Sequence, residues 1–326
     1  MFLSFFIHFN SDETMKKIIE YHYNIYIDEL NNKAQYFMFD YNSEKYFFVP
    51  LNRSIEDLDD IMLVNNEMKN KGLITHDIIL NKENKILTKT NEANYILLKL
   101  NGNLKDKYDI FDIMDNNEKL IVSPTKSKLY RNDWANLWSA KIDYFEYQIR
   151  ELGKNKRIVI DSFSYYIGLA ENAISYVNKT TSTIPKMAED KITLSRKRIH
   201  YPNYRLSYMN PINLIFDLEV RDIAEYTKSA FFNGGSAFEE LKEFLKRKKL
   251  SRFGYQMLFG RLLYPSYYFD LFESIMEKEE KEEKILKIIE KTQDYELFLC
   301  NIYYLISKYS MIEPVEWITR QFKDQH

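Results

Sequence analysis

The pattern of the chain changes near residue 101, and this change constrains the fold more than any other feature. Before it, short apolar runs alternate with polar turns and one well-marked helical pattern. From about residue 127 the chain is mainly helical, as in the apolar stripe over 134–149, which follows helical spacing. The sequence therefore predicts an α+β, bilobal fold, with a small lobe of sheet plus helix at 1–100 and a helical large lobe at 101–326.

The small lobe is expected to contain a hairpin, a capped helix and further strands. Aromatic and β-branched runs on both sides of the polar turn 41–44 predict a β-hairpin over 35–50. Ser54 and Asp57 match a helix-capping pattern, which predicts a helix over 55–71 that ends at Gly72. A helix is also expected over 12–31, and three more strands are expected at 77–80, 85–88 and 94–100.

Composition excludes several classes of function. The chain has 326 residues and only 8 glycines, and no two of these lie in the spacing of a usual phosphate-binding glycine loop. A net charge of −2 argues against recruitment of nucleic acid or an acidic membrane surface. One cysteine and five histidines without metal-ligand spacing make a zinc site unexpected. The short apolar segment 1–9 is expected to be a core strand, not a signal peptide, and no run is long enough for a membrane helix.

Two strings in the second half carry a resemblance to a known family. They are Arg221-Asp-Ile-Ala-Glu-Tyr226 and Gly260-Arg-Leu-Leu-Tyr-Pro-Ser-Tyr-Tyr-Phe269. Over about 195–275 the chain resembles the kinase-like proteins of the endospore coat, of the CotS and YutH types. That family is similar in fold to aminoglycoside phosphotransferases and protein kinases. The resemblance implies a protein-kinase-like fold, which agrees with the order of elements in the first 100 residues.

The resemblance also implies where catalytic residues would lie, and this chain departs from the pattern. Phosphoryl transfer uses an Asp that accepts or orients a proton, and an Asn and an Asp that hold Mg²⁺. In the register of the family's catalytic loop, Arg198 stands in place of the catalytic Asp, and Asn203 keeps the Asn. A guanidinium cannot act as a base, because its pKa exceeds about 12. Asn203 and Asp217 are the candidate metal ligands, although Asp217 is alternatively a turn residue, and Asp222 is expected to brace the loop backbone.

The nucleotide-binding parts of a kinase are also incomplete. A kinase small lobe uses a strand Lys on the phosphates and a helix Glu that holds this Lys. Lys45 is the best candidate for the cofactor-binding lysine, with Glu56 or Glu67 as its partner. The turn at 41–44 has no glycine, which hinders the approach of a phosphate to backbone N–H groups.

The leading functional prediction is a catalytically degenerate kinase-like protein, a pseudokinase that keeps the kinase fold but does not catalyse phosphoryl transfer. The resemblance implies a structural or interaction role with other coat or sporulation proteins, in the cytoplasm of the mother cell or in the spore coat. No cofactor, nucleic acid or membrane is expected as a partner. The alternative is an active ATP-dependent small-molecule phosphotransferase that uses ATP and Mg²⁺ with rearranged residues. Its candidate residues are Asp217 and Asn203, together with either Asp190 or Asp161.

Overall fold

The computed structural model describes residues 12–33, 36–73, 75–90, 93–101, 106–119, 127–277 and 280–320. The core strand expected at 1–9 lies outside the described residues. Contacts within the chain define two compact units. The first holds the described residues within 1–106, 126–129 and 205–214, and the second holds those within 107–125, 130–204 and 215–326. The lobe boundary expected at residue 100 stays a prediction.

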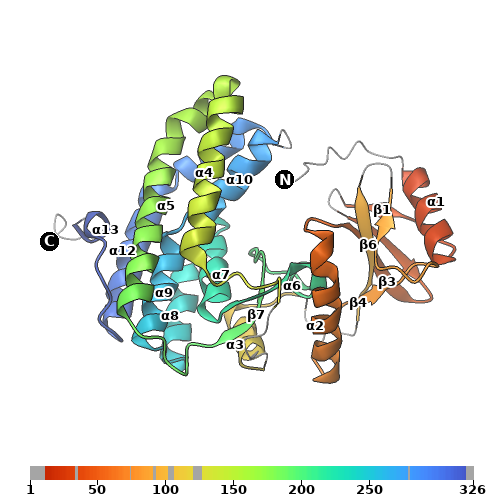
Figure 1. Ribbon diagram of the computed structural model, residues 1–326, viewed down its shortest axis with the longest axis horizontal. Helices are drawn as coiled ribbons and strands as arrows, with labels where there is room; N and C mark the ends of the chain where they lie inside the picture. The colour runs from red at the N-terminus through yellow and green to blue at the C-terminus, as the bar shows by residue number, and fades with distance from the viewer. Residues whose placement is uncertain are drawn as a thin grey trace. The chain divides into compact units, whose positions relative to one another are not determined.

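The first unit is built on an antiparallel sheet, shown in Figure 1. Its strands follow the order β1-β2-β3-β6-β4, and β5 also pairs with β6. The strands are β1 (Asn31–Asn32), β2 (Phe37–Tyr41), β3 (Glu44–Pro50), β4 (Asp77–Ile79), β5 (Thr88–Lys89) and β6 (Asn94–Lys99). The helical elements are α1 (Asp12–Tyr23), η1 (Ile55–Asp57), α2 (Leu58–Asn70), α6 (Arg205–Tyr208) and η3 (Pro211–Asn213).

The predicted hairpin and capped helix are both present. β2 and β3 pair from Phe37 opposite Phe48 to Tyr41 opposite Glu44. The two residues of the turn between these strands both have positive φ, 50° and 62°, which is the conformation of a tight hairpin turn. The Ser54 hydroxyl accepts a hydrogen bond from a backbone N–H of η1, and α2 ends beside Gly72, whose φ is 71°.

Other elements of the small lobe differ from the prediction in extent. Helix α1 ends at Tyr23, and the next residue, Asn24, has a left-handed φ of 52° that stops the helix. The strand expected at 85–88 is reduced to Thr88–Lys89. The backbone before it is instead held by Asn81, whose side-chain oxygen accepts from two backbone N–H groups, at 3.0 Å each.

The second unit is mostly helical. Figure 1 shows α4 and α5 running alongside each other, and α5 also packs on α9. Its larger helices are α3 (Ile110–Lys119), α4 (Trp134–Leu152), α5 (Arg157–Thr183), α7 (Val220–Phe232), α8 (Ala237–Arg247), α9 (Arg252–Leu263), α10 (Ser266–Met276) and α12 (Thr292–Ser307). Its shorter elements are η2 (Gly153–Asn155), η4 (Glu282–Ile285), α11 (Leu286–Ile289) and α13 (Glu316–Arg320). No helix in the described parts of the chain is long and apolar enough to cross a membrane.

A two-stranded sheet, not expected from the sequence, lies among these helices. It pairs β7 (Ile192–Arg196) with β8 (Leu214–Leu218), and every residue of both strands is buried. The segment up to about residue 212 contains Pro185, Pro202 and Pro211, and prolines are typical of loops. β7 alternates apolar and polar residues only over 192–195, and so short a pattern is a weak signal for a strand.

Candidate functional site

The resemblance places the family's catalytic loop in the segment that follows β7, and Asp222 of α7 holds the beginning of this segment. The backbone N–H of Arg196 lies 3.2 Å and 3.1 Å from the two carboxylate oxygens of Asp222. Both residues are buried, and no part of Asp222 is exposed. The bracing role that the resemblance implied for Asp222 is therefore present, and it fits a register in which Arg196 begins the loop motif.

Arg221, beside Asp222, holds the same loop through backbone carbonyl groups. Its guanidinium donates to the carbonyl oxygen of Arg196 and, at 3.0 Å, to that of Lys197. The same guanidinium lies 3.0 Å from a carboxylate oxygen of Asp217 and 3.2 Å from one of Asp222. The planar fork of arginine suits such a multiple contact. Sequence reasoning missed this residue, although it belongs to the first family string.

Asp217, a candidate metal ligand, lies at the end of β8 and is completely buried. Its oxygens accept from the indole N–H of Trp134, at 2.8 Å and 3.0 Å, and from the N–H of Leu218 at 2.7 Å. Burial raises the pKa of the Asp217 carboxyl to about 7, and the Arg221 charge opposes this shift. Each of these neighbours donates a hydrogen bond to Asp217, and such donors meet the hydrogen-bonding capacity of a carboxylate without a metal ion.

Asn203, the second candidate ligand, is held through its backbone. Its carbonyl oxygen accepts from the N–H of Tyr108 at 2.9 Å, and the neighbouring Tyr204 forms a β-bridge with Lys107. Asn203 is 2% exposed, and its side-chain amide nitrogen has no hydrogen-bond partner among the described residues. No group of three or more potential metal-ligating side chains is found in the described ranges.

Arg198 makes a salt bridge with α10. One guanidinium nitrogen lies 2.6 Å from a carboxylate oxygen of Asp270, and both side chains are about half-buried. Asp270 raises the pKa of the Arg198 guanidinium above its already high ordinary value. The side chain at this position is therefore a permanent cation with an internal counter-ion.

A buried network joins the two strings that carry the family resemblance. Glu225 of the first string lies 2.6 Å from Arg261 of the second and 2.9 Å from Lys228, and it accepts from the hydroxyl of Ser266 at 3.0 Å. The guanidinium of Arg261 also lies over the Trp134 ring, 4.9 Å from its centroid. The residues of both strings thus meet in one polar cluster that holds α7 against α9.

The candidate nucleotide-binding residues of the first unit have other partners. Lys45, at the exposed start of β3, lies 3.3 Å from Asp40 across the hairpin, and its side chain is 51% exposed. Glu56 pairs with Lys128 at 3.2 Å, and Glu67 pairs with Lys71 at 2.8 Å. The expected pair between Lys45 and a helix glutamate does not form. The buried side of α2 instead carries Leu58, Ile61, Asn65 and Met68.

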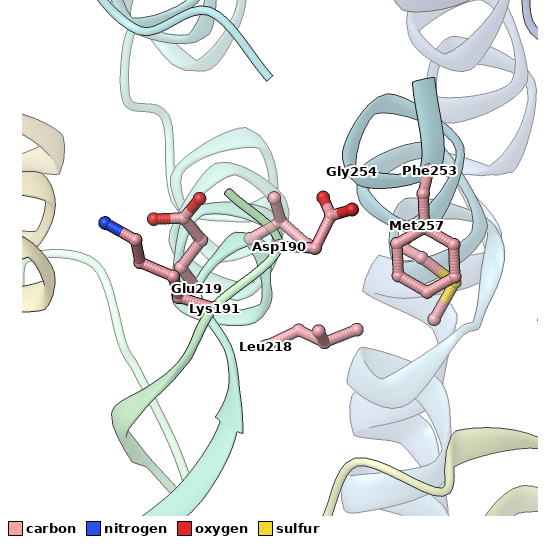
Figure 2. Close-up of a pocket in the computed structure, with 8 residues that line it drawn as sticks. Asp190, Lys191, Leu218, Glu219, Phe253, Gly254 and Met257 are labelled. Carbon is pink, nitrogen blue, oxygen red and sulfur yellow. The ribbon is translucent and has the colours of Figure 1, made fainter. Parts of the chain in front are cut away.

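The remaining candidate carboxylates have structural contacts. Asp190 accepts from the Ser251 hydroxyl at 2.5 Å and from the N–H of Met187 at 2.7 Å. Asp161 lies on the surface of α5, 3.7 Å from Arg157. Asp190 also lines a small pocket, in which Figure 2 shows it between the Lys191–Glu219 side and the α9 side chains. This pocket has room for about one water molecule, too little for a nucleotide.

Comparison with solved structures defines the class of fold. The chain superposes on an aminoglycoside phosphotransferase from Alicyclobacillus acidocaldarius subsp. acidocaldarius DSM 446 with a TM-score of 0.57, at 7% identity, over 88% of this chain and 95% of that one. A microcompartment-associated aminopropanol kinase gives 0.56 at 10% identity, over 91% and 98%. An AMP-bound spectinomycin phosphotransferase gives 0.51 at 14% identity, over 84% and 94%. The fold is therefore that of the aminoglycoside phosphotransferases, as expected.

Sequence comparison then identifies the family. The model of the family described as "Spore coat putative kinase YutH" matches residues 16–302, so the chain belongs to this family of spore coat kinase-like proteins. It is 31% identical over 184 residues to the endospore coat-associated protein YutH of Bacillus subtilis (strain 168). That alignment covers 51% of this chain and 54% of the relative, about half the length of each.

Proposed function

We propose that this chain is a catalytically degenerate member of its family and acts through interaction with other coat or sporulation proteins. The single observation that carries the proposal is Arg198, the residue that the resemblance aligns with the proton-accepting Asp of the family pattern. A guanidinium stays protonated up to about pH 12 and accepts no proton from a substrate hydroxyl. Its salt bridge with Asp270 also gives it a counter-ion within the chain.

The other parts of a phosphotransferase site support the same proposal. Asp217 is bound by Trp134 and Arg221, and Lys45 pairs with a surface carboxylate on its own hairpin. Phosphoryl transfer is mostly positioning and electrostatic stabilisation, so the loss of several positioned charges together is more damaging than the loss of one. We therefore propose that the chain needs neither ATP nor Mg²⁺ for its role.

The proposed place of action follows from the relative. The Bacillus subtilis protein is named as coat-associated, so we propose that this chain is made in the mother-cell cytoplasm and joins the coat there. Its partners would then be coat proteins, which use the surface of the fold instead of a catalytic cleft.

The second candidate function is an active ATP-dependent small-molecule phosphotransferase. One observation favours it: the buried amide of Asn203 has a nitrogen without a partner among the described residues, at a position where the family pattern has a metal-binding Asn. The unpaired amide nitrogen is a hydrogen-bond donor, so the partner that it lacks is an acceptor such as a phosphate oxygen, whereas Mg²⁺ would bind the amide oxygen. Asp217 would then have to exchange its present partners for Mg²⁺, with Asp190 or Asp161 assisting.

A nucleotide titration separates the two functions. Thermal unfolding is measured with ATP alone, with Mg²⁺ alone and with both, beside an assay of ATP turnover in the presence of candidate amine and alcohol acceptors. The degenerate protein is expected to show no turnover and no shift that requires both ligands. Stabilisation by ATP that requires Mg²⁺, together with ATP turnover that is lost in Asp217→Ala and kept in Glu239→Ala, would establish the phosphotransferase instead. Glu239 is the matched control because it is an exposed carboxylate of α8 outside the candidate site.

A further inference from the structure

The position of Arg221 explains why Asp217 and Asp222 do not fit a metal ion: the guanidinium already contacts both carboxylates. Its guanidinium contacts the carboxylates of Asp217 and Asp222 and the backbone carbonyls that open the loop after β7. Carboxylate and carbonyl oxygens are also the ligands that Mg²⁺ uses in proteins. Arg221 is 4% exposed and both carboxylates are fully buried, so this contact set is shielded from solvent.

The charges around Arg221 are already compensated. The buried or nearly buried carboxylates of the cluster are Asp217, Asp222 and Glu225, and the buried cations are Arg196, Arg221, Lys228 and Arg261. The four cations therefore outnumber the three carboxylates. A divalent cation is favoured where negative charge is in excess, and the low dielectric of the interior makes an added unpaired charge costly.

We propose, on the basis of the degenerate-kinase function proposed above, that Arg221 is a built-in cation that replaces the metal ion of a phosphotransferase. It neutralises Asp217 and Asp222 and ties β8 and α7 to the loop. Through these contacts the loop keeps its conformation with no divalent cation or nucleotide bound. The fold thereby becomes independent of Mg²⁺, which suits a protein that serves as an interaction surface.

The test uses the full chain without nucleotide and two substitutions at one position. Arg221→Ala removes the cation and leaves space between two carboxylates, whereas Arg221→Met removes the cation but fills much of that space with an apolar side chain. Thermal unfolding is followed by circular dichroism in chelator-treated buffer, with MgCl₂ or with NaCl at matched ionic strength. Sensitised terbium emission is a second readout, because the Trp134 indole lies 2.8 Å from Asp217.

The wild-type protein is expected to unfold at the same temperature with either salt and to give no sensitised terbium emission from this site. The unfolding temperature of Arg221→Ala should be about 10 °C below that of the wild type, and it should rise again by about 5 °C with MgCl₂ but not with NaCl. The Arg221→Ala protein should also gain terbium emission. Arg221→Met should be destabilised without regaining stability in MgCl₂. Arg53→Ala is the matched control in the first unit, because it breaks the buried pair between Arg53 and Asp57, at 2.9 Å.

Two results would overturn the inference. One is a wild-type protein that MgCl₂ stabilises more than NaCl does in the absence of nucleotide. The other is an Arg221→Ala protein that gains neither stability nor terbium emission, including the case in which it fails to fold with and without MgCl₂. Because no nucleotide is present, these outcomes are independent of ATP turnover. Turnover by the wild type would instead refute the proposed function.

Discussion

Replacement of Glu225 by glutamine tests whether the cluster between the family strings holds the large unit together. Glu225 is the common partner of Lys228 at 2.9 Å and Arg261 at 2.6 Å, and the Lys228 side chain is 2% exposed. Glutamine keeps the shape but removes the charge, so two buried cations lose their counter-ion. Breaking a buried pair in this way costs about 3–5 kcal/mol.

The assay is equilibrium unfolding by denaturant and by heat. A decrease of about 3–5 kcal/mol in the free energy of unfolding lowers the unfolding temperature of a unit as long as the second one by about 10 °C. The matched control is Glu239→Gln, because Glu239 and Lys242 form a pair with the same i,i+3 spacing at 3.0 Å on the surface of α8. That substitution is expected to leave the unfolding midpoint unchanged, since exposed pairs contribute little.

The pH dependence gives a second check on Glu225→Gln. Burial lowers the pKa of Lys228 to about 8 in the native protein, and the Glu225 charge opposes this shift. Loss of Glu225 lowers the native pKa further, so the unfolded chain binds more protons than the native protein over a wider range. The variant should therefore become more stable as pH rises from about 7 to about 9. Equal decreases in the free energy of unfolding of Glu225→Gln and Glu239→Gln would refute the role assigned to the cluster.

Two further predictions concern a close helix contact and a buried imidazole. A Cβ at Gly260 would lie 2.8 Å from a methyl carbon of Val177. Gly260→Ala should therefore lower the free energy of unfolding, measured by denaturant titration, by about 1–3 kcal/mol. Adding Val177→Ala to this variant should restore part of the lost stability, because it removes the methyl carbon that the new Cβ would meet. Burial lowers the pKa of His76 to about 4 in the native protein. As the pH falls, His76 therefore takes up a proton in the unfolded chain at a higher pH than in the native protein. Stability should fall by up to about 3 kcal/mol as pH falls from about 6.5 to about 4, and His76→Phe should show a smaller fall when unfolding is measured across this range.

Local signals in the sequence predicted much of the fold. The hairpin β2–β3 follows from two aromatic runs around a polar turn, and helix α2 follows from Ser54 and Gly72. These features depend on neighbours in sequence, so they can be recognised without knowledge of the tertiary structure. β7 was missed because it is stabilised by burial on all sides, and its polar residues hide that burial in the sequence.

The candidate site was likewise predicted from the sequence only in part. The register that gives Arg198 its position came from the family strings, and the contact between Asp222 and the N–H of Arg196 agrees with it. The partners of Asp217 could not be predicted, because Trp134 lies 83 positions away along the chain. Lys45 was chosen for its strand, yet the direction of its side chain and its pairing with Asp40 depend on the register of the hairpin.

Residue identity alone thus establishes that a cation, not a carboxylate, occupies position 198, since the chemistry of a guanidinium holds in any fold. Whether a carboxylate is free to bind a ligand depends on which groups surround it in three dimensions. Asp217 receives hydrogen bonds or charge from α4, from its own strand and from α7. Only the packing of these separate segments brings Arg221 between two buried carboxylates, because the energy of a buried charge is set by its nearest neighbours in space.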